Sequence, residues 1–277
     1  MRPPRSDIAL PPLPPAVEWV IADPKRIEPH SARGPVLVAF LEFGDPHSVR
    51  TIPYLQAWHQ RYHSDGLTVL GVHTPKLTIA TDNRALEAAA RRLGISFAVI
   101  NDHHAAIWHE YGCQGWPSLF LWRIRGSLFW TQFGEHEMCA TETEIRRLLI
   151  DAAASRDRPP PALAKPIGPL RPEHAPAAPL RVPSDPLAPG GPGRPRRTDS
   201  DSESLEVDYE GGSAWATLSG NGRIWCSLDA AAEAAITLSG PGAYELATHR
   251  SHSAHHLSIR AEPTVELWAL AFAPGRA

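Results

Sequence analysis

The sequence predicts an α/β domain with a central mixed sheet flanked by helices, then a proline-rich linker and a small all-β sandwich. Three observations lead to this organisation. Strand and helix patterns alternate through the first half of the chain, thirteen prolines lie between Arg158 and Arg197, and short apolar runs follow them. The chain has 277 residues, of which 43% are hydrophobic, and this is enough to build two cores.

The proline content sets the expected domain boundaries. Prolines dominate residues 1–16 and 155–204, and neither stretch holds enough aromatic or branched side chains to offset the entropy of ordering it. We therefore expect a disordered N-terminal arm over 1–16 and a disordered linker over 155–204. The folded parts are then an α/β domain over 17–154 and a β-sandwich over 205–275.

The first strand and helix of the α/β domain follow each other closely. Residues 35–43, PVLVAFLEF, form a continuous apolar run that is typical of a central strand buried on both faces. Asp45 and Pro46 then indicate a helix start, with aspartate as the N-cap and proline at the first helical position. The apolar side of this helix recurs every three to four residues, at Ile52, Leu55, Trp58 and Tyr62.

The rest of the domain continues the alternation. Strands are expected over 67–72, 96–100, 118–123 and 127–133, and helices over 82–93, 103–111 and 141–154. The pair His103 and His104 is interpreted as the start of the short helix rather than as a ligand set. The order of elements favours an α/β sheet that ends in an antiparallel hairpin.

The second block shows short, often alternating runs separated by glycines, which predicts an antiparallel sandwich. A helix is conceivable only in the alanine run 230–235. The expected strands are 205–209, 213–218, 223–228, 235–238, 242–248, 255–259 and 265–272.

Composition excludes several classes of protein. The net charge of −3 gives no reason to expect nucleic acid or an anionic membrane as a partner. No apolar run approaches the roughly 18 residues of a membrane span. The opening MRPPRSDIALPPLPP lacks an apolar core for a secretory leader, so a cytoplasmic location is expected. No cofactor is indicated. Three cysteines, none in a CxxC pair, exclude a disulfide scaffold and a cysteine zinc ribbon.

The first block resembles the thioredoxin-fold domains of the TlpA type, and more closely the redoxin domain of bacterial DipZ-like proteins. The resemblance covers about residues 17–152. It is carried by PVLVAFLEF, DPHSVRTIPYLQAWHQRY, GLTVLGVHTP, YGCQGWPSLFLWRIRGSLFW and FGEHE, in the family's order. It implies a thioredoxin-like fold with a cis-proline at Pro117. The segments GPGAYELATHRSH and ELWALAFAPG are similar, more weakly, to the β-sandwich of DipZ-like proteins.

The chain departs from this family at the redox centre. Asp45 and Ser48 occupy the two cysteine positions of the family's CxxC motif, and Gly44 replaces its tryptophan. Thiol–disulfide exchange needs one thiolate to attack a disulfide and a second thiol to resolve the mixed disulfide. A carboxylate and a hydroxyl can do neither. We therefore expect a binding or adaptor module for a protein or peptide, acting through Pro46, His47, Trp116 and Pro117.

Two other interpretations concern the first block. Cys113 lies four residues before Pro117, and it is either a lone reactive thiol, as in a monothiol oxidoreductase or peroxidase, or a small buried residue, which is favoured. Cys139 and Cys226 are expected to be structural. Asp45, His47 and Ser48 contain the residue types of a catalytic triad, but on one helical turn they are not expected to form one.

The second block carries two further candidate sites. His249, His252 and His255 are weak candidates for a metal site, although neighbouring residues of a strand face opposite sides. Three tryptophans could line a carbohydrate surface, but packing in the core is favoured: Trp215, Trp225 and Trp268.

Overall fold

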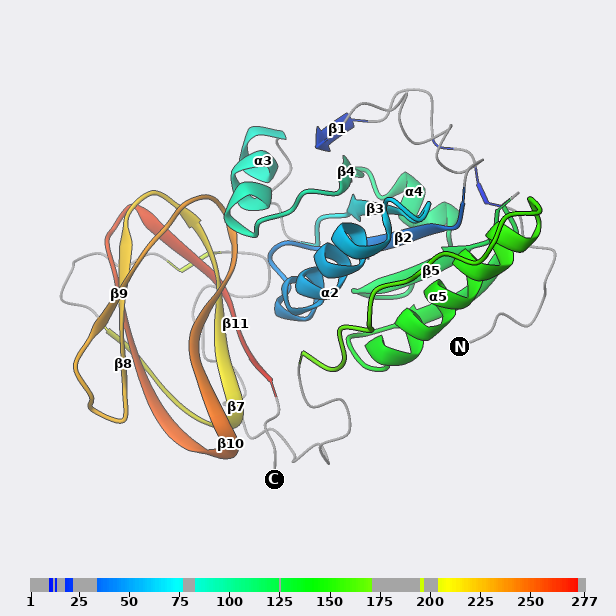
Figure 1. Cartoon of the computed structure of the whole chain (residues 1–277). Coiled ribbons are helices and arrows are strands. Elements are labelled where there is room, and N and C mark those ends of the chain that lie inside the picture. The colour runs from blue at the N-terminus through cyan, green and yellow to red at the C-terminus, as the bar shows by residue number, and fades with distance from the viewer. Residues whose placement is uncertain are drawn as a thin grey trace. The chain divides into compact units, whose positions relative to one another are not determined.

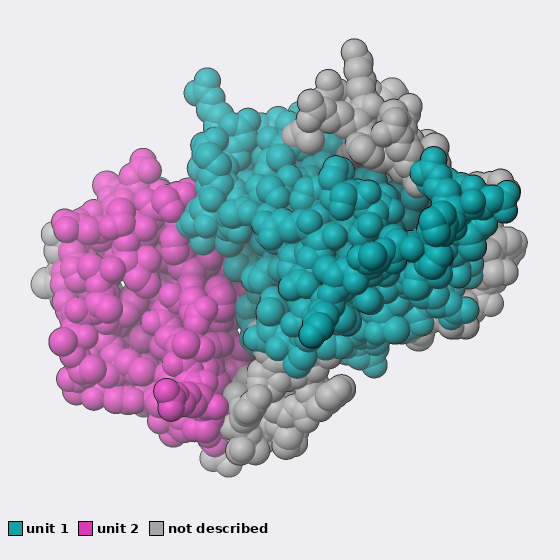
Figure 2. All heavy atoms as spheres, in the orientation of Figure 1, with its two compact units in different colours: residues 1–42, 47–76, 81–173 teal, residues 43–46, 77–80, 174–277 magenta. Residues whose placement is uncertain are grey.

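The computed structural model describes residues 10–11, 13, 18–21, 34–76, 83–124, 126–170, 195–196 and 204–273. The chain divides into two compact units (Figure 2). The first comprises residues 1–42, 47–76 and 81–173, and the second 43–46, 77–80 and 174–277.

The first unit is built on a six-stranded mixed sheet in the order β1-β4-β3-β2-β5-β6 (Figure 1). Its strands are β1 (Glu18–Ile21), β2 (Val36–Leu41), β3 (Thr68–His73), β4 (Ala98–Asn101), β5 (Ser118–Trp122) and β6 (Leu128–Phe133). Its helices are α2 (Pro46–Tyr62), α3 (Asn83–Arg92), α4 (Ala106–Glu110) and α5 (Met138–Ala154). Strand β2 pairs in parallel with β3 and antiparallel with β5, which confirms the predicted α/β sheet with a final hairpin.

The core of this sheet follows from its residues. Every residue of β2, β3 and β5 is buried, as expected for apolar strands covered on both faces. Helix α2 begins at Pro46, whose missing N–H costs nothing at the first helical position. Its predicted apolar side is inside, with Trp58 and Tyr62 fully buried.

Two predictions at the edge of the sheet need correction. Strand β1 was not expected, and it pairs antiparallel with β4. Helix α4 begins at Ala106 rather than at His103, because the Asp102 carboxylate accepts the backbone N–H groups of Ile107 (3.1 Å) and Trp108 (2.9 Å). His103 and His104 lie in the preceding turn, with ring centroids 3.8 Å apart.

Residues 163–170, here called the strap, belong to the first unit instead of forming the start of a loose linker. The backbone N–H of Ile167 donates to both carboxylate oxygens of Glu142, at 3.1 Å each. The N–H of Leu170 donates to the hydroxyl of Tyr54 at 2.8 Å. Arg61 donates to the carbonyl of Lys165 at 2.5 Å. The strap is therefore held through its main chain by side chains of α2 and α5.

The carboxylate of Glu142 lies at the centre of this attachment, and Glu142 is only 2% exposed. The Tyr62 hydroxyl donates to Glu142 at 2.6 Å, and Arg146 donates to the Tyr62 hydroxyl at 3.0 Å. A buried carboxylate is costly unless it is hydrogen-bonded, so the strap and Tyr62 together make its burial possible.

The remaining parts of the two proline-rich stretches are only partly described. Leu10 and Leu13 pack against the core of the first unit, and the N–H of Leu10 donates to the Gly126 carbonyl at 2.6 Å. Residues 1–9, 12 and 14–16 of the expected arm, and residues 171–194 and 197–203 of the expected linker, lie outside the described residues.

The second unit is an antiparallel five-stranded sheet in the order β11-β7-β10-β8-β9, consistent with the predicted β-sandwich. Its strands are β7 (Ser204–Gly220), β8 (Arg223–Leu228), β9 (Ala234–Thr237), β10 (Gly242–Ala261) and β11 (Val265–Ala273). The longest of these curve strongly (Figure 1), so that their inward side chains enclose one apolar core.

The predicted strand boundaries in this unit were wrong at two places. The runs 205–209 and 213–218 are one strand, β7, and the runs 242–248 and 255–259 are one strand, β10. Glycines 211 and 212 do not end β7. The pairing instead shifts register between Thr248 and Ser253, so residues 249–252 bulge from the ladder opposite Gly212. The alanine run 230–235 is a turn followed by β9, and not a helix.

The attachment of the strap gives a stability prediction. Glu142→Ala removes a buried carboxylate that accepts hydrogen bonds from Tyr62 and Ile167. Each hydrogen bond to a charged group contributes roughly 1.5–3 kcal/mol, so we expect the free energy of unfolding to fall by about 2–3 kcal/mol. Glu87→Ala is the control, because Glu87 is exposed and pairs with the exposed Arg91. Equal effects of the two substitutions in urea unfolding would contradict the proposed role of the strap contacts.

Candidate functional site

The candidate site lies where β2 ends, α2 begins and β5 starts. Phe40 of β2 is paired with Ser118 of β5, so the loop after β2 and Pro117 share one edge of the sheet. The Trp116–Pro117 peptide bond is cis, as the resemblance implies. The carbonyl of Pro117 accepts the N–H of Gly134 at 2.8 Å, which fixes the proline against the end of β6.

Ser48, which the resemblance aligns with the second cysteine of the motif, is fully buried in the first turn of α2. Its hydroxyl oxygen accepts the backbone N–H of Glu42 at 3.1 Å. This hydrogen bond joins the first turn of the helix to the residue directly after β2. The hydroxyl thus satisfies a buried backbone donor.

His47 and Arg50 face a carboxylate that sequence reasoning did not identify. His47 Nδ1 lies 3.2 Å from Glu135, and Arg50 Nε lies 3.4 Å from the other oxygen of the same carboxylate. Glu135 follows β6 in the segment FGEHE, which the resemblance marked without assigning a role. The His47 side chain is 45% exposed, so its imidazole is available to a binding partner beside this ion pair.

The structure does not assemble a triad from Asp45, His47 and Ser48. His47 is directed to Glu135, and Ser48 is bonded to the backbone of Glu42. Helix α2 does begin directly after Asp45, as an N-cap at that position requires, whereas the capping hydrogen bond itself stays a prediction.

Trp116 is one of the residues expected to contact a partner. It is half-buried, and its ring stacks on that of Trp108 with centroids 5.2 Å apart and planes inclined by 22°. One face of the indole is therefore occupied by Trp108. A peptide could contact Trp116 only through its remaining face or edge.

Cys113 is 4% exposed and belongs to a core cluster with Tyr111 packed against it. Burial, and secondarily the Asp102 carboxylate, raise the pKa of the Cys113 thiol to about 12. The thiol is consequently protonated at neutral pH, whereas a nucleophilic cysteine must be a thiolate. Cys113, Cys139 and Cys226 are all free cysteines, and burial also raises the pKa of Cys226 to about 12.

The metal candidates of the second unit do not converge on one point. Within the described part of the chain, no group of three or more His, Cys, Asp or Glu side chains is arranged to hold a metal ion. His249 and His255 stack with centroids 3.6 Å apart instead of pointing both rings at a common centre.

The tryptophans of the second unit have other partners. Trp215 is 7% exposed, and its Nε1 donates to Ser213 at 3.0 Å. The guanidinium of Arg260 lies 4.1 Å from the centroid of the Trp225 ring, and that of Arg223 lies 5.2 Å from it. Cations thus occupy the surface of Trp225 that a sugar would stack on.

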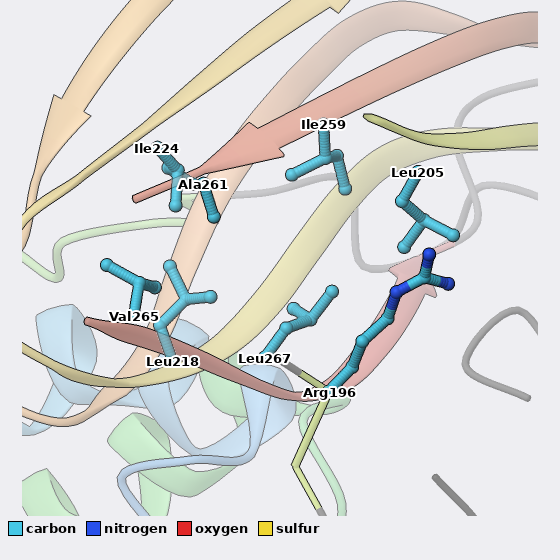
Figure 3. A pocket seen from close by; sticks show the side chains of 8 residues that line it. All are labelled: Arg196, Leu205, Leu218, Ile224, Ile259, Ala261, Val265 and Leu267. Carbon is cyan, nitrogen blue, oxygen red and sulfur yellow. The ribbon is translucent and has the colours of Figure 1, made fainter. Parts of the chain in front are cut away.

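A small cavity opens at one end of the sandwich and is mostly apolar, with one arginine at its edge (Figure 3). Its volume of about 20 Å³ is enough for one water-sized molecule and too small for a ligand. It is lined by Arg196, Leu205, Leu218, Ile224, Ile259, Ala261, Val265 and Leu267. We therefore regard it as a packing space of the core.

The strand order, the helix that follows β2 and the cis-proline before β5 define a thioredoxin-like domain. The chain is similar to the protein DipZ of Mycobacterium tuberculosis, with 34% identity over 139 residues, which are 50% of this chain and 20% of DipZ. Human NHL repeat-containing protein 2 is 26% identical over 131 residues, 47% of this chain and 18% of that protein.

Among solved structures, a thiol-disulfide isomerase from Corynebacterium glutamicum is 24% identical, with a TM-score of 0.46, and the match covers 50% of this chain and 96% of that one. No protein-family model matches the chain. The chain spans about a fifth of the length of the curated relatives named above. None of the helices in the described ranges is long and apolar enough to cross a bilayer.

The environment of Cys113 predicts slow alkylation. In a Cys139→Ser variant, iodoacetamide at pH 7 should modify Cys113 at least about 100-fold more slowly than free cysteine, because its thiolate forms only near pH 12. Denaturant should restore the ordinary rate, and mass spectrometry of tryptic peptides measures both. Modification of the folded protein at the rate of free cysteine would reinstate the monothiol hypothesis.

Proposed function

We propose that the chain is a redoxin-like protein without dithiol activity that binds extended protein segments beside cis-Pro117. The observation that carries the first half of this proposal is the state of the redox centre. Asp45 and Ser48 stand where the resembling family has its two cysteines, and Ser48 is buried and bonded to the backbone of Glu42. With no sulfur at either position, a mixed disulfide cannot form or resolve there.

The residues around Asp45 and Ser48 support the second part of the proposal, the binding of extended protein segments. The peptide bond before Pro117 is cis, and Arg50 in the first turns of α2 pairs with Glu135. Backbone groups at such a proline can pair with an extended segment, and the half-exposed His47 offers a polar contact beside them. We therefore propose a protein or peptide as the binding partner.

Two alternatives have less support. A lone-thiol enzyme would need an accessible thiolate, and the buried Cys113 lacks one. A carbohydrate module would need an open aromatic face, and the Trp225 ring is flanked by Arg223 and Arg260.

Reduction of insulin by dithiothreitol tests the loss of redox activity. The wild-type chain should not accelerate insulin precipitation above the rate with dithiothreitol alone. The matched control is the double variant Asp45→Cys, Ser48→Cys, which restores a Cys-Pro-His-Cys sequence at the start of α2 and should gain turnover. Turnover by the wild-type chain that equals this variant would refute the proposal.

Binding of an unfolded, S-carboxymethylated protein tests the adaptor role separately, because its blocked cysteines cannot react. Titration by fluorescence anisotropy should show binding that Trp116→Ala weakens roughly tenfold or more, since aromatic anchors contribute about 2 kcal/mol. Trp268→Ala, in the second unit, serves as the control and should leave the affinity unchanged. Absence of binding, or equal losses in both variants, would contradict this role.

A further inference from the structure

Three side chains of the second unit form a line of hydrogen bonds that the sequence did not suggest. His255 Nε2 lies 2.8 Å from the Ser253 hydroxyl, and His255 Nδ1 lies 2.7 Å from a carboxylate oxygen of Asp229. Ser253 and His255 are two residues apart in β10 and so share one face of the strand. Asp229 comes from the turn after β8, which brings it to His255 from a neighbouring strand.

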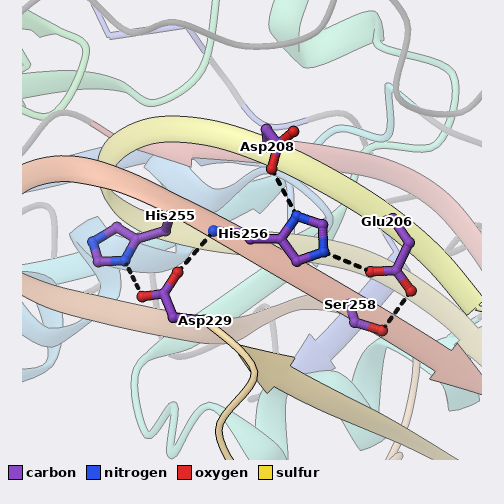
Figure 4. Close-up of polar contacts among 6 residues, drawn as sticks. All are labelled: Glu206, Asp208, Asp229, His255, His256 and Ser258. Carbon is purple, nitrogen blue, oxygen red and sulfur yellow. Dashed lines mark hydrogen bonds and ion pairs between the residues drawn. The ribbon is translucent and has the colours of Figure 1, made fainter.

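The Asp229 carboxylate is held by both of its oxygens (Figure 4). One faces His255 Nδ1, and the other accepts the backbone N–H of His256 at 2.9 Å. The N–H of His256 and the ring of His255 both keep the pKa of Asp229 below its usual range. An ionised Asp229 assigns the ring proton of His255 to Nδ1, and the lone pair on Nε2 then faces the hydroxyl of Ser253.

The imidazole of His255 is fixed by its neighbours as well. It stacks on His249 with planes inclined by 17°, and it lies opposite Tyr209 of β7 in the pairing register. The Tyr209 hydroxyl lies 2.6 Å from His249 Nε2, so the stacked ring is itself anchored. The His255 side chain is only 14% exposed, which restricts its orientation.

The turn that presents Asp229 is strained. Asp229 and Ala230 have φ values of 51° and 60°, and the N–H of Ala231 donates to the Leu228 carbonyl at 2.9 Å. Two left-handed residues in succession favour Asn-Gly, and each non-glycine residue in this region costs about 1–2 kcal/mol. Such strain is typical of positions where side-chain placement matters for function.

We propose that Ser253 is a nucleophile toward carboxylic esters, with His255 as its general base and Asp229 as the residue that positions His255. Ser253 is partly exposed and directly follows the bulge 249–252, which is not paired with β7. Ser253 does not line the apolar cavity, so that cavity is not the acyl-binding site.

The reaction balances without a cofactor. The Ser253 oxygen forms a bond to the ester carbonyl carbon while its proton passes to His255 Nε2. The C–O bond to the alcohol then breaks, and the same proton leaves with the alcohol. Water repeats the sequence on the acyl-serine, which releases the carboxylic acid and restores the free serine.

A fluorophosphonate probe on the full-length chain tests this proposal, because it reacts with base-activated serines and releases fluoride. Mass spectrometry should place the phosphonyl group on Ser253. His255→Ala should slow this labelling at least about 100-fold, the usual contribution of a general base, and Asp229→Asn should slow it in the same direction. The matched control residue is Ser258, on the same strand and bonded to Glu206, which should stay unmodified.

Hydrolysis of p-nitrophenyl acetate supplies a second readout, in which Ser253→Ala should remove the part of the rate that the probe blocks. Circular dichroism of each variant establishes that the second unit is still folded. Labelling of Ser253 and Ser258 at equal rates, or unchanged labelling of Ser253 in folded Asp229→Asn and His255→Ala variants, would overturn the proposal.

Discussion

The pairing of β2 with β3 on one side and β5 on the other governs the first unit. It is parallel to β3 and antiparallel to β5, so the end of β2 and the start of β5 meet at one edge of the sheet. Helix α2 starts at that edge, and so does the segment that contains cis-Pro117. Any side chain placed in the first turn of α2 is therefore presented beside the proline.

In this chain, hydrogen bonds and ion pairs join the side chains at this edge of the sheet. Ser48 satisfies the backbone N–H of Glu42, and Glu135 gathers His47 and Arg50. Hydrogen bonds and ion pairs of this kind stabilise the edge without providing a group that exchanges electrons. These contacts at the edge that carries cis-Pro117 are the basis of the proposed binding role.

Local signals in the sequence were sufficient where hydrophobic periodicity and helix starts determine the structure. The buried strand β2, the start of α2 at Pro46 and the apolar side of that helix were predicted from them. Long-range contacts were not accessible in this way. The main-chain bonds of the strap to Glu142 and Tyr54 join segments 25 and 116 residues apart, and a proline-rich composition gave no sign of them.

The candidate sites also differ in how far the sequence could predict them. The proposal of a redox centre without thiols could be made from the sequence because Asp45 and Ser48 are only three residues apart. Ser253 and His255 are close in sequence, but their carboxylate partner Asp229 reaches them only through the pairing of β8 with β10.

The hydrogen bond of Leu170 to Tyr54 has a mechanical consequence. Because Leu170 is fixed beside α2, the chain leaves the described part of the first unit at this point and not at the end of α5.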